Sequence, residues 1–118
     1  MKSTSEQSLL NSYLQDESRK TGSSDRIFFP ETEADVISIF QQTPDTPVTL
    51  QGARTGLTAG CVPEGGLIVN LQRMNRILDF QPSETSGSIT VQPGILLQTL
   101  RQYLQRHPHP RPLFFPPD

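Results

Sequence analysis

The sequence predicts an α/β (α+β) fold in which helices flank a small, mostly parallel sheet. First, segments with the period of an amphipathic helix alternate with short apolar segments typical of strands. Second, residues 65–71 (GGLIVNL) are almost continuously apolar, as in a strand that is covered on both faces. Third, the connection from Gly52 to Gly66 is just long enough for the crossover that two parallel strands need.

The N-terminal half predicts two helices and two strands. Ser3 and Glu6 have the spacing of a capping box. They precede residues that form one apolar stripe at helical spacing, so we expect a helix over 3–20. The members of the stripe are Leu9, Leu10, Tyr13 and Leu14. After a loop at 21–25, residues 26–30 (RIFFP) predict a strand. Residues 31–43 predict a helix with Thr32 and Asp35 as capping residues and four buried side chains: Val36, Ile37, Ile39 and Phe40. Residues 48–52 (VTLQG) predict a strand that leads into the glycines.

The C-terminal half predicts a strand over 65–71, a single helical turn at QRMNR, a hairpin and a helix. The hairpin consists of ILDF and SITVQ, joined by the loop QPSETSG. Residues 93–107 form the most regular helical pattern, with Pro93-Gly94 at its start. The apolar stripe of this helix has five members: Leu96, Leu97, Leu100, Tyr103 and Leu104. The last residues, PHPRPLFFPPD, predict an extended, proline-stiffened end.

Length, charge and cysteine content exclude several classes of protein. The 118 residues form one domain of ordinary size or part of a larger one. A net charge of −2, with no basic block longer than Arg19-Lys20, argues against a nucleic-acid partner. The single cysteine, Cys61, allows no internal disulfide and no thiolate cluster, which favours a cytoplasmic protein. No run approaches the roughly 18 apolar residues of a membrane span.

The remaining reactive side chains do not form a recognisable catalytic or metal centre. His107 and His109 lie on a stiff proline segment with no third ligand nearby, so we expect no metal site. Cys61 has no neighbouring base, which favours an incidental thiol over a nucleophile. Three aspartates show no pairing suited to acid–base catalysis: Asp45, Asp79 and Asp118. We therefore predict no catalytic residue.

The segment QGARTGLTAG (51–60) places glycines at 52, 56 and 60. Its spacing differs from the dinucleotide-binding G-x-G-x-x-G, and the Gly-Lys-Ser/Thr of a Walker loop is absent. One interpretation is a flexible turn between strands. The other is an anion nest of backbone amides, to which Thr55 and Thr58 add hydroxyls and Arg54 adds charge. The spacing alone leaves both open.

Residues 48–78 (VTLQGARTGLTAGCVPEGGLIVNLQRMNRIL) resemble the first signature of the flavoprotein oxidoreductases related to vanillyl-alcohol oxidase and p-cresol methylhydroxylase (the PCMH type). Within that family they are most similar to glycolate oxidase subunits and D-lactate dehydrogenases. Three flanking pieces agree in order: FPETEADVISIF, VQPGILLQTLRQYL and FFPPD. The resemblance covers residues 26–118, and residues 1–25 are expected to form an N-terminal helix and linker.

The resemblance implies FAD as cofactor, with its pyrophosphate bound by the glycine loop. The residues implied to bind it are Gly52, Ala53, Arg54, Thr55, Gly56, Leu57, Thr58 and Gly60, with Pro117 in the proline step beside the flavin. Ala59 stands where glycine is common in the family. The loop has no histidine, so covalent flavin attachment through it is not supported. In the parent enzyme we expect Gly56→Val to abolish flavin retention while leaving the helices folded, because a branched Cβ would occupy the place of the anion.

The implied function is the FAD-binding part of an oxidoreductase that acts on a small 2-hydroxy acid of the glycolate or D-lactate type. The family continues beyond PPD with a second glycine-rich stretch and a substrate domain, so the chain resembles a truncated FAD domain. Alone, it is expected to be inactive, to bind FAD weakly or not at all, and to self-associate through uncovered apolar surface. Two alternatives stay open. One is a flavoenzyme for a sugar alcohol or a phenol, and the other is a non-catalytic module that binds a nucleotide, a phosphate or a protein.

Overall fold

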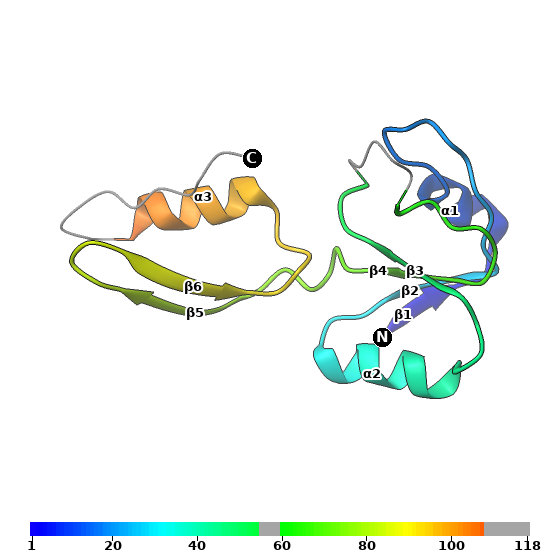
Figure 1. Ribbon diagram of the computed structural model, residues 1–118, viewed down its shortest axis with the longest axis horizontal. Helices are drawn as coiled ribbons and strands as arrows, with labels where there is room; N and C mark the ends of the chain where they lie inside the picture. The colour runs from blue at the N-terminus through cyan, green and yellow to red at the C-terminus, as the bar shows by residue number, and fades with distance from the viewer. Residues whose placement is uncertain (55–59, 108–118) are drawn as a thin grey trace.

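A computed structural model describes residues 1–54 and 60–107, which form a four-stranded sheet and a two-stranded sheet (Figure 1). The larger sheet has the order β1 (Lys2–Thr4), β2 (Arg26–Phe29), β4 (Leu67–Asn70) and β3 (Val48–Gln51). β4 pairs in parallel with both β2 and β3, whereas β1 pairs antiparallel with β2. The predicted α/β fold with a mostly parallel sheet is confirmed, including the parallel pair that the glycine-rich connection joins.

The core lies on both faces of the two central strands. Ile27 and Ile68 are fully buried on one face, where they pack with Phe29 and with two leucines of the N-terminal segment, Leu10 and Leu14. α2 (Glu33–Gln42) lies on the opposite side of the sheet from α1 (Gln7–Leu10) (Figure 1). Because β4 is covered on both sides, its four residues are all buried, as the apolar run predicted.

The predicted helix over 3–20 is wrong. Lys2–Thr4 instead form β1, in register with β2, and helical structure is confined to α1 and the short 3₁₀ helix η1 (Asn11–Tyr13). The hydroxyl of Thr4 accepts a hydrogen bond from the backbone of Glu6, 3.2 Å away, so the predicted capping box does not form. Pairing with a strand more than twenty residues away overrides the local helical pattern.

α2 begins as predicted but buries a narrower side. The Thr32 hydroxyl accepts a hydrogen bond from the backbone of Asp35 at 3.1 Å and caps the first turn. Ile39 is buried and Val36 half-buried. Ile37 and Phe40 are exposed, so their predicted burial is wrong. They lie beside the helix stripe that faces the sheet, which is too narrow to include them.

The second unit is a hairpin covered by a helix. β5 (Ile77–Pro82) and β6 (Gly87–Val91) pair antiparallel, which confirms the predicted hairpin. α3 (Leu97–Arg106) lies along it (Figure 1), and the rings of Phe80 and Tyr103 meet edge to face with centroids 5.6 Å apart. The predicted stripe of α3 is only partly correct. Leu100 is buried, but Leu96 precedes the helix and is exposed, as is Leu97.

Residues 71–76 join the two units through backbone hydrogen bonds. They form a turn rather than the predicted helical turn, with the Met74 amide donating to the Leu71 carbonyl at 2.9 Å. The Gly94 amide donates to the Met74 carbonyl at 2.8 Å, and the Gln92 amide donates to the Arg76 carbonyl at 2.9 Å. In the described part of the chain, no helix is long and apolar enough to cross a membrane. The predicted extended end at 108–118 lies outside the described residues.

Candidate functional site

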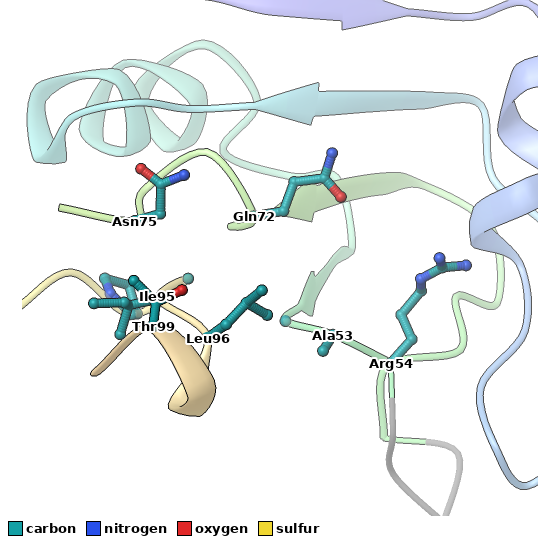
Figure 2. A pocket seen from close by; sticks show the side chains of 10 residues that line it. Ala53, Arg54, Gln72, Asn75, Ile95, Leu96 and Thr99 are labelled. Carbon is teal, nitrogen blue, oxygen red and sulfur yellow. The ribbon is translucent and has the colours of Figure 1, made fainter. Parts of the chain in front are cut away.

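A cavity of about 540 Å³ lies at the carboxyl ends of β3 and β4 (Figure 2). Gly52, Ala53 and Arg54 border it from the end of β3. The turn after β4 and the start of α3 supply the other lining residues: Gln72, Asn75, Pro93, Gly94, Ile95, Leu96 and Thr99. The carboxyl ends of parallel strands are where open α/β sheets collect their ligands. The position of this cavity therefore marks it as the candidate site.

Two buried side-chain amides, those of Gln51 and Asn70, lie at the strand ends just before the residues that line the cavity. Gln51 and Asn70 are opposite each other at the ends of β3 and β4, and the Asn70 Nδ2 donates to Gln51 Oε1 at 3.0 Å. Gln51 Nε2 donates to the carbonyls of Tyr13 at 2.6 Å and Cys61 at 3.0 Å. The Asn70 Oδ1 accepts from the backbone of Gln72 at 3.0 Å. One network of uncharged groups thus connects the ends of β3 and β4 to Cys61, which follows the glycine loop, and to the turn after β4.

Gly52 and Gly60 are two glycines that neither their backbone conformation nor the described atoms around them require, and of the two only Gly52 lines the cavity. The φ of Gly52 is not positive, and no heavy atom of the described residues lies within 4 Å of a Cβ placed there. Gly66 differs, because it has a φ of +68° and its Cβ would lie 2.3 Å from the Pro47 carbonyl oxygen. A side chain at Gly52 would meet neither backbone strain nor any described atom within 4 Å. The bare backbone there faces space that a bound group can use.

Arg54 has a positive φ, and its guanidinium makes two contacts with the N-terminal segment. Its φ is +60°, in the left-handed region that residues with a Cβ disfavour by roughly 1–2 kcal/mol. Its guanidinium donates to the Ser12 carbonyl and lies over the Tyr13 ring, 4.8 Å from the centroid. In Figure 2 the side chain points away from Leu96 and toward the N-terminal segment.

The opposite wall of the cavity combines polar and apolar groups. Among the described residues, the side-chain amides of Gln72 and Asn75 have no hydrogen-bond partner. Leu96, 58% exposed, occupies the N-cap position of α3 and supplies no side-chain cap. The first turn of α3 reaches the cavity through Thr99. Because the N-terminus of a helix carries partial positive charge and free amides, this wall favours an anion.

Cys61 lies near the site but is not an activated thiol. Burial, followed by the nearby Asp16 carboxylate, raises the pKa of the thiol above its ordinary value. Its sulfur donates weakly to Asp16 Oδ2, 3.7 Å away. A raised pKa keeps the thiol protonated at neutral pH, whereas a nucleophile needs the thiolate. In the described ranges, no three His, Cys, Asp or Glu side chains form a group that could hold a metal ion.

The structure brings together part of the predicted site. Gly52, Ala53 and Arg54 line the cavity, whereas the exposed Gly60 does not. Thr55, Gly56, Leu57, Thr58 and Pro117 lie outside the described residues. Gln72 and the start of α3 were not predicted as part of the site, and Leu96 was expected only on the apolar stripe of the helix. The available signal was Pro93-Gly94, because both residues of this helix-start pair line the cavity.

Comparisons with known proteins agree on the family. The chain matches the family described as "FAD binding domain" over residues 24–115. It is 38% identical over 73 residues to D-lactate dehydrogenase of Anaerostipes hadrus, covering 61% of this chain and 14% of that protein. It is 34% identical over 73 residues to glycolate oxidase subunit GlcD of Bacillus subtilis (strain 168), with the same coverage of 61% and 14%. The chain therefore spans about one seventh of the length of these relatives.

A solved structure shows the same fold. Alkyldihydroxyacetonephosphate synthase superimposes with a TM-score of 0.74 at 15% sequence identity, over 88% of this chain and 24% of that one. At this identity the likeness concerns the fold alone. It extends across both the larger sheet and the hairpin unit, since it covers most of the chain.

Proposed function

This chain belongs to the family of FAD-binding domains, and from that premise we propose that its cavity at the ends of β3 and β4 binds the pyrophosphate of FAD. Backbone amides of Gly52–Arg54 and of the following loop would contact the phosphate oxygens. The observation that carries the proposal is Gly52. Neither its φ nor any described protein atom requires a glycine there, whereas close approach of a ligand to the backbone does.

The other lining groups fit an anion with organic groups on both sides. The uncapped first turn of α3 offers partial positive charge, and the side-chain amides of Gln72 and Asn75 offer donors. Ile95 and Leu96 add apolar surface. A dinucleotide has the same mixture of a charged centre, polar sugars and flat apolar rings. The residues present therefore fit FAD.

When bound, FAD would accept a hydride at its ring nitrogen, and the protein would bind and orient the cofactor. In this chain the Gln51–Asn70 network would fix the loop that positions the cofactor. We propose that the function served is the oxidation of a 2-hydroxy acid, because lactate and glycolate, which the two relatives' names contain, are both 2-hydroxy acids. A cytoplasmic location fits the single cysteine.

The proposal is tested by titrating the ¹⁵N-labelled 118-residue chain with FAD, ADP and riboflavin and following the backbone amides by NMR. FAD and ADP contain a pyrophosphate and are expected to shift Gly52–Arg54 and the first turn of α3. Riboflavin has no phosphate and is expected to leave Gly52–Arg54 unshifted. Shifts confined to other regions, or equal responses to riboflavin, would contradict a pyrophosphate site here.

Gly52→Ala provides the matched variant. The added methyl meets no described atom, so we expect the free energy of unfolding to change by less than about 0.5 kcal/mol. The FAD dissociation constant is expected to rise by about tenfold, because the methyl displaces the anion from the backbone. Thr90→Ala, on the exposed side of β6, is the control and should bind as the wild type does. Unchanged binding by Gly52→Ala would remove the main support for the site.

A further inference from the structure

We propose that the N-terminal segment around η1 braces the FAD loop, and that Arg54 acts as a positioning residue rather than as a phosphate ligand. The segment precedes residues 24–115, which the family match covers. The part of this inference that concerns FAD rests on the proposed function. The part that concerns the loop backbone does not.

Three contacts connect η1 to the start of the loop. The Arg54 guanidinium donates to the Ser12 carbonyl and lies over the Tyr13 ring. One residue before the loop, Gln51 Nε2 donates to the Tyr13 carbonyl at 2.6 Å. Backbone and side-chain atoms of η1 thus hold both ends of the four-residue stretch from Gln51 to Arg54.

The brace is itself anchored in the core. The Tyr13 ring packs edge to face on Phe29 of β2, with centroids 5.4 Å apart. Leu10 and Leu14, on either side of η1, are buried against the same strands. The Tyr13 ring is therefore held in place by the core, and its contact with Arg54 holds the start of the loop in place.

The backbone of Arg54 explains why a brace is needed. A residue with a Cβ keeps a positive φ only where its surroundings impose it, and the surroundings here are the two contacts of its guanidinium. The side chain extends toward the N-terminal segment and away from Leu96 on the far wall (Figure 2). The cation is used within the protein, so the loop start offers the ligand backbone amides instead of a guanidinium.

The first test reads the loop without any cofactor, in the full chain. A positive φ gives a strong intraresidue NOE between the amide and Hα protons, so wild-type Arg54 should show one. Tyr13→Phe keeps the ring and should preserve this NOE, whereas Tyr13→Leu removes the cation–π contact and should weaken it. An unchanged NOE in a folded Tyr13→Leu chain would overturn the brace.

The second test separates positioning from ligation at Arg54. If Arg54 acts by fixing φ, Arg54→Gly should bind FAD within about threefold of wild type, because glycine adopts a positive φ freely. Arg54→Ala should then bind about tenfold more weakly. A phosphate ligand would instead make both variants equally weak, and Tyr13→Leu would bind normally. That result would overturn the positioning role.

The two proposals fail in different ways. A wild-type chain whose Gly52–Arg54 amides respond to neither FAD nor ADP, even at the high ligand concentrations that detect weak binding, contradicts the proposed pyrophosphate site, while the NOE still decides the brace. Should Tyr13→Leu not fold, the Arg54 variants carry the test, because the Arg54 side chain is partly exposed and its removal leaves the core intact. The NOE at residue 54 should weaken in Arg54→Ala, which keeps neither contact of the guanidinium.

Discussion

At the scale of single residues, Gly52 and Gly94 border the same cavity for different reasons. A Cβ on Gly94 would lie 1.7 Å from the Leu71 carbonyl oxygen and 2.9 Å from that of Met74, so this glycine allows two segments of the chain to touch. A Cβ on Gly52 would meet no described atom. Gly94 is required by the packing of the folded protein, whereas Gly52 is the glycine on which the proposed phosphate site depends.

Gly94→Ala is therefore expected to destabilise the chain. The methyl cannot be accommodated against a backbone carbonyl without moving the turn at 71–76, and overpacking of this kind costs about 1–3 kcal/mol. Urea unfolding followed by circular dichroism measures the free energy of unfolding. Gly52→Ala is the control and should unfold at nearly the wild-type urea concentration. Equal stability of the two variants would show that the Leu71 contact is not maintained in solution.

Sequence patterns predicted where the glycine segment begins, but not the side-chain hydrogen bonds beside the candidate site. The glycines after a strand correctly placed the loop at the carboxyl end of β3. The Gln51–Asn70 pair was not predicted, because one polar residue at the end of an apolar strand is also typical of a surface position. Only the register of β3 against β4 brings the two amides together and makes them buried partners.

At the scale of elements, the start of α3 that borders the cavity has no side-chain N-cap. Leu96 has the extended backbone of an N-cap residue, with φ −78° and ψ 140°, but its side chain cannot accept a hydrogen bond. Serine or aspartate would normally occupy this position. The first-turn amides of α3 are thus left for solvent or for a ligand.

Leu96→Ser and Leu96→Asp test this interpretation as a pair. Both side chains cap the helix, so each should raise the free energy of unfolding by about 1 kcal/mol. The aspartate also adds a negative charge at the wall of the cavity and should weaken FAD binding at least about fivefold more than serine does. Thermal unfolding and the NMR titration measure the two effects. Equal FAD binding by both variants would place the phosphates away from α3.

The N-terminal elements show where local patterns fail. In the predicted apolar stripe Leu10 and Leu14 are buried but Leu9 is 51% exposed, and the helix predicted around them does not extend over 3–20. The hydrogen bonds of β1 go to β2, and no local pattern identifies so distant a partner. The hairpin β5–β6 and the helix α2 were predicted because their determinants, turn residues and a Thr32 cap, are local.

At the scale of the whole molecule, the chain is elongated, with extents of 50 × 31 × 21 Å. The larger sheet and the hairpin unit meet at the turn 71–76 and the start of α3, with the cavity between them. The hairpin has two strands, and such a sheet is only marginally stable unless something packs on it. α3 covers one side, while Leu78 of β5 remains 59% exposed.

We expect the chain to self-associate at micromolar concentration, because unpaired strand edges and exposed apolar side chains favour pairing between copies. Size-exclusion chromatography with light scattering should show a dimer or a higher oligomer. Leu78→Ser should shift the distribution toward monomer, whereas Thr90→Ala should not. A monomer at high concentration in the wild-type chain would contradict this expectation.

The hydrogen bond from Gln51 to the Tyr13 carbonyl has a thermodynamic consequence. Coupling between two sites is reciprocal, so if the contacts of the N-terminal segment with Gln51 and Arg54 favour a bound ligand, the ligand favours those contacts equally. We expect occupancy of the cavity to slow the opening of the first fourteen residues, because the carbonyls of Ser12 and Tyr13 accept hydrogen bonds from Arg54 and Gln51.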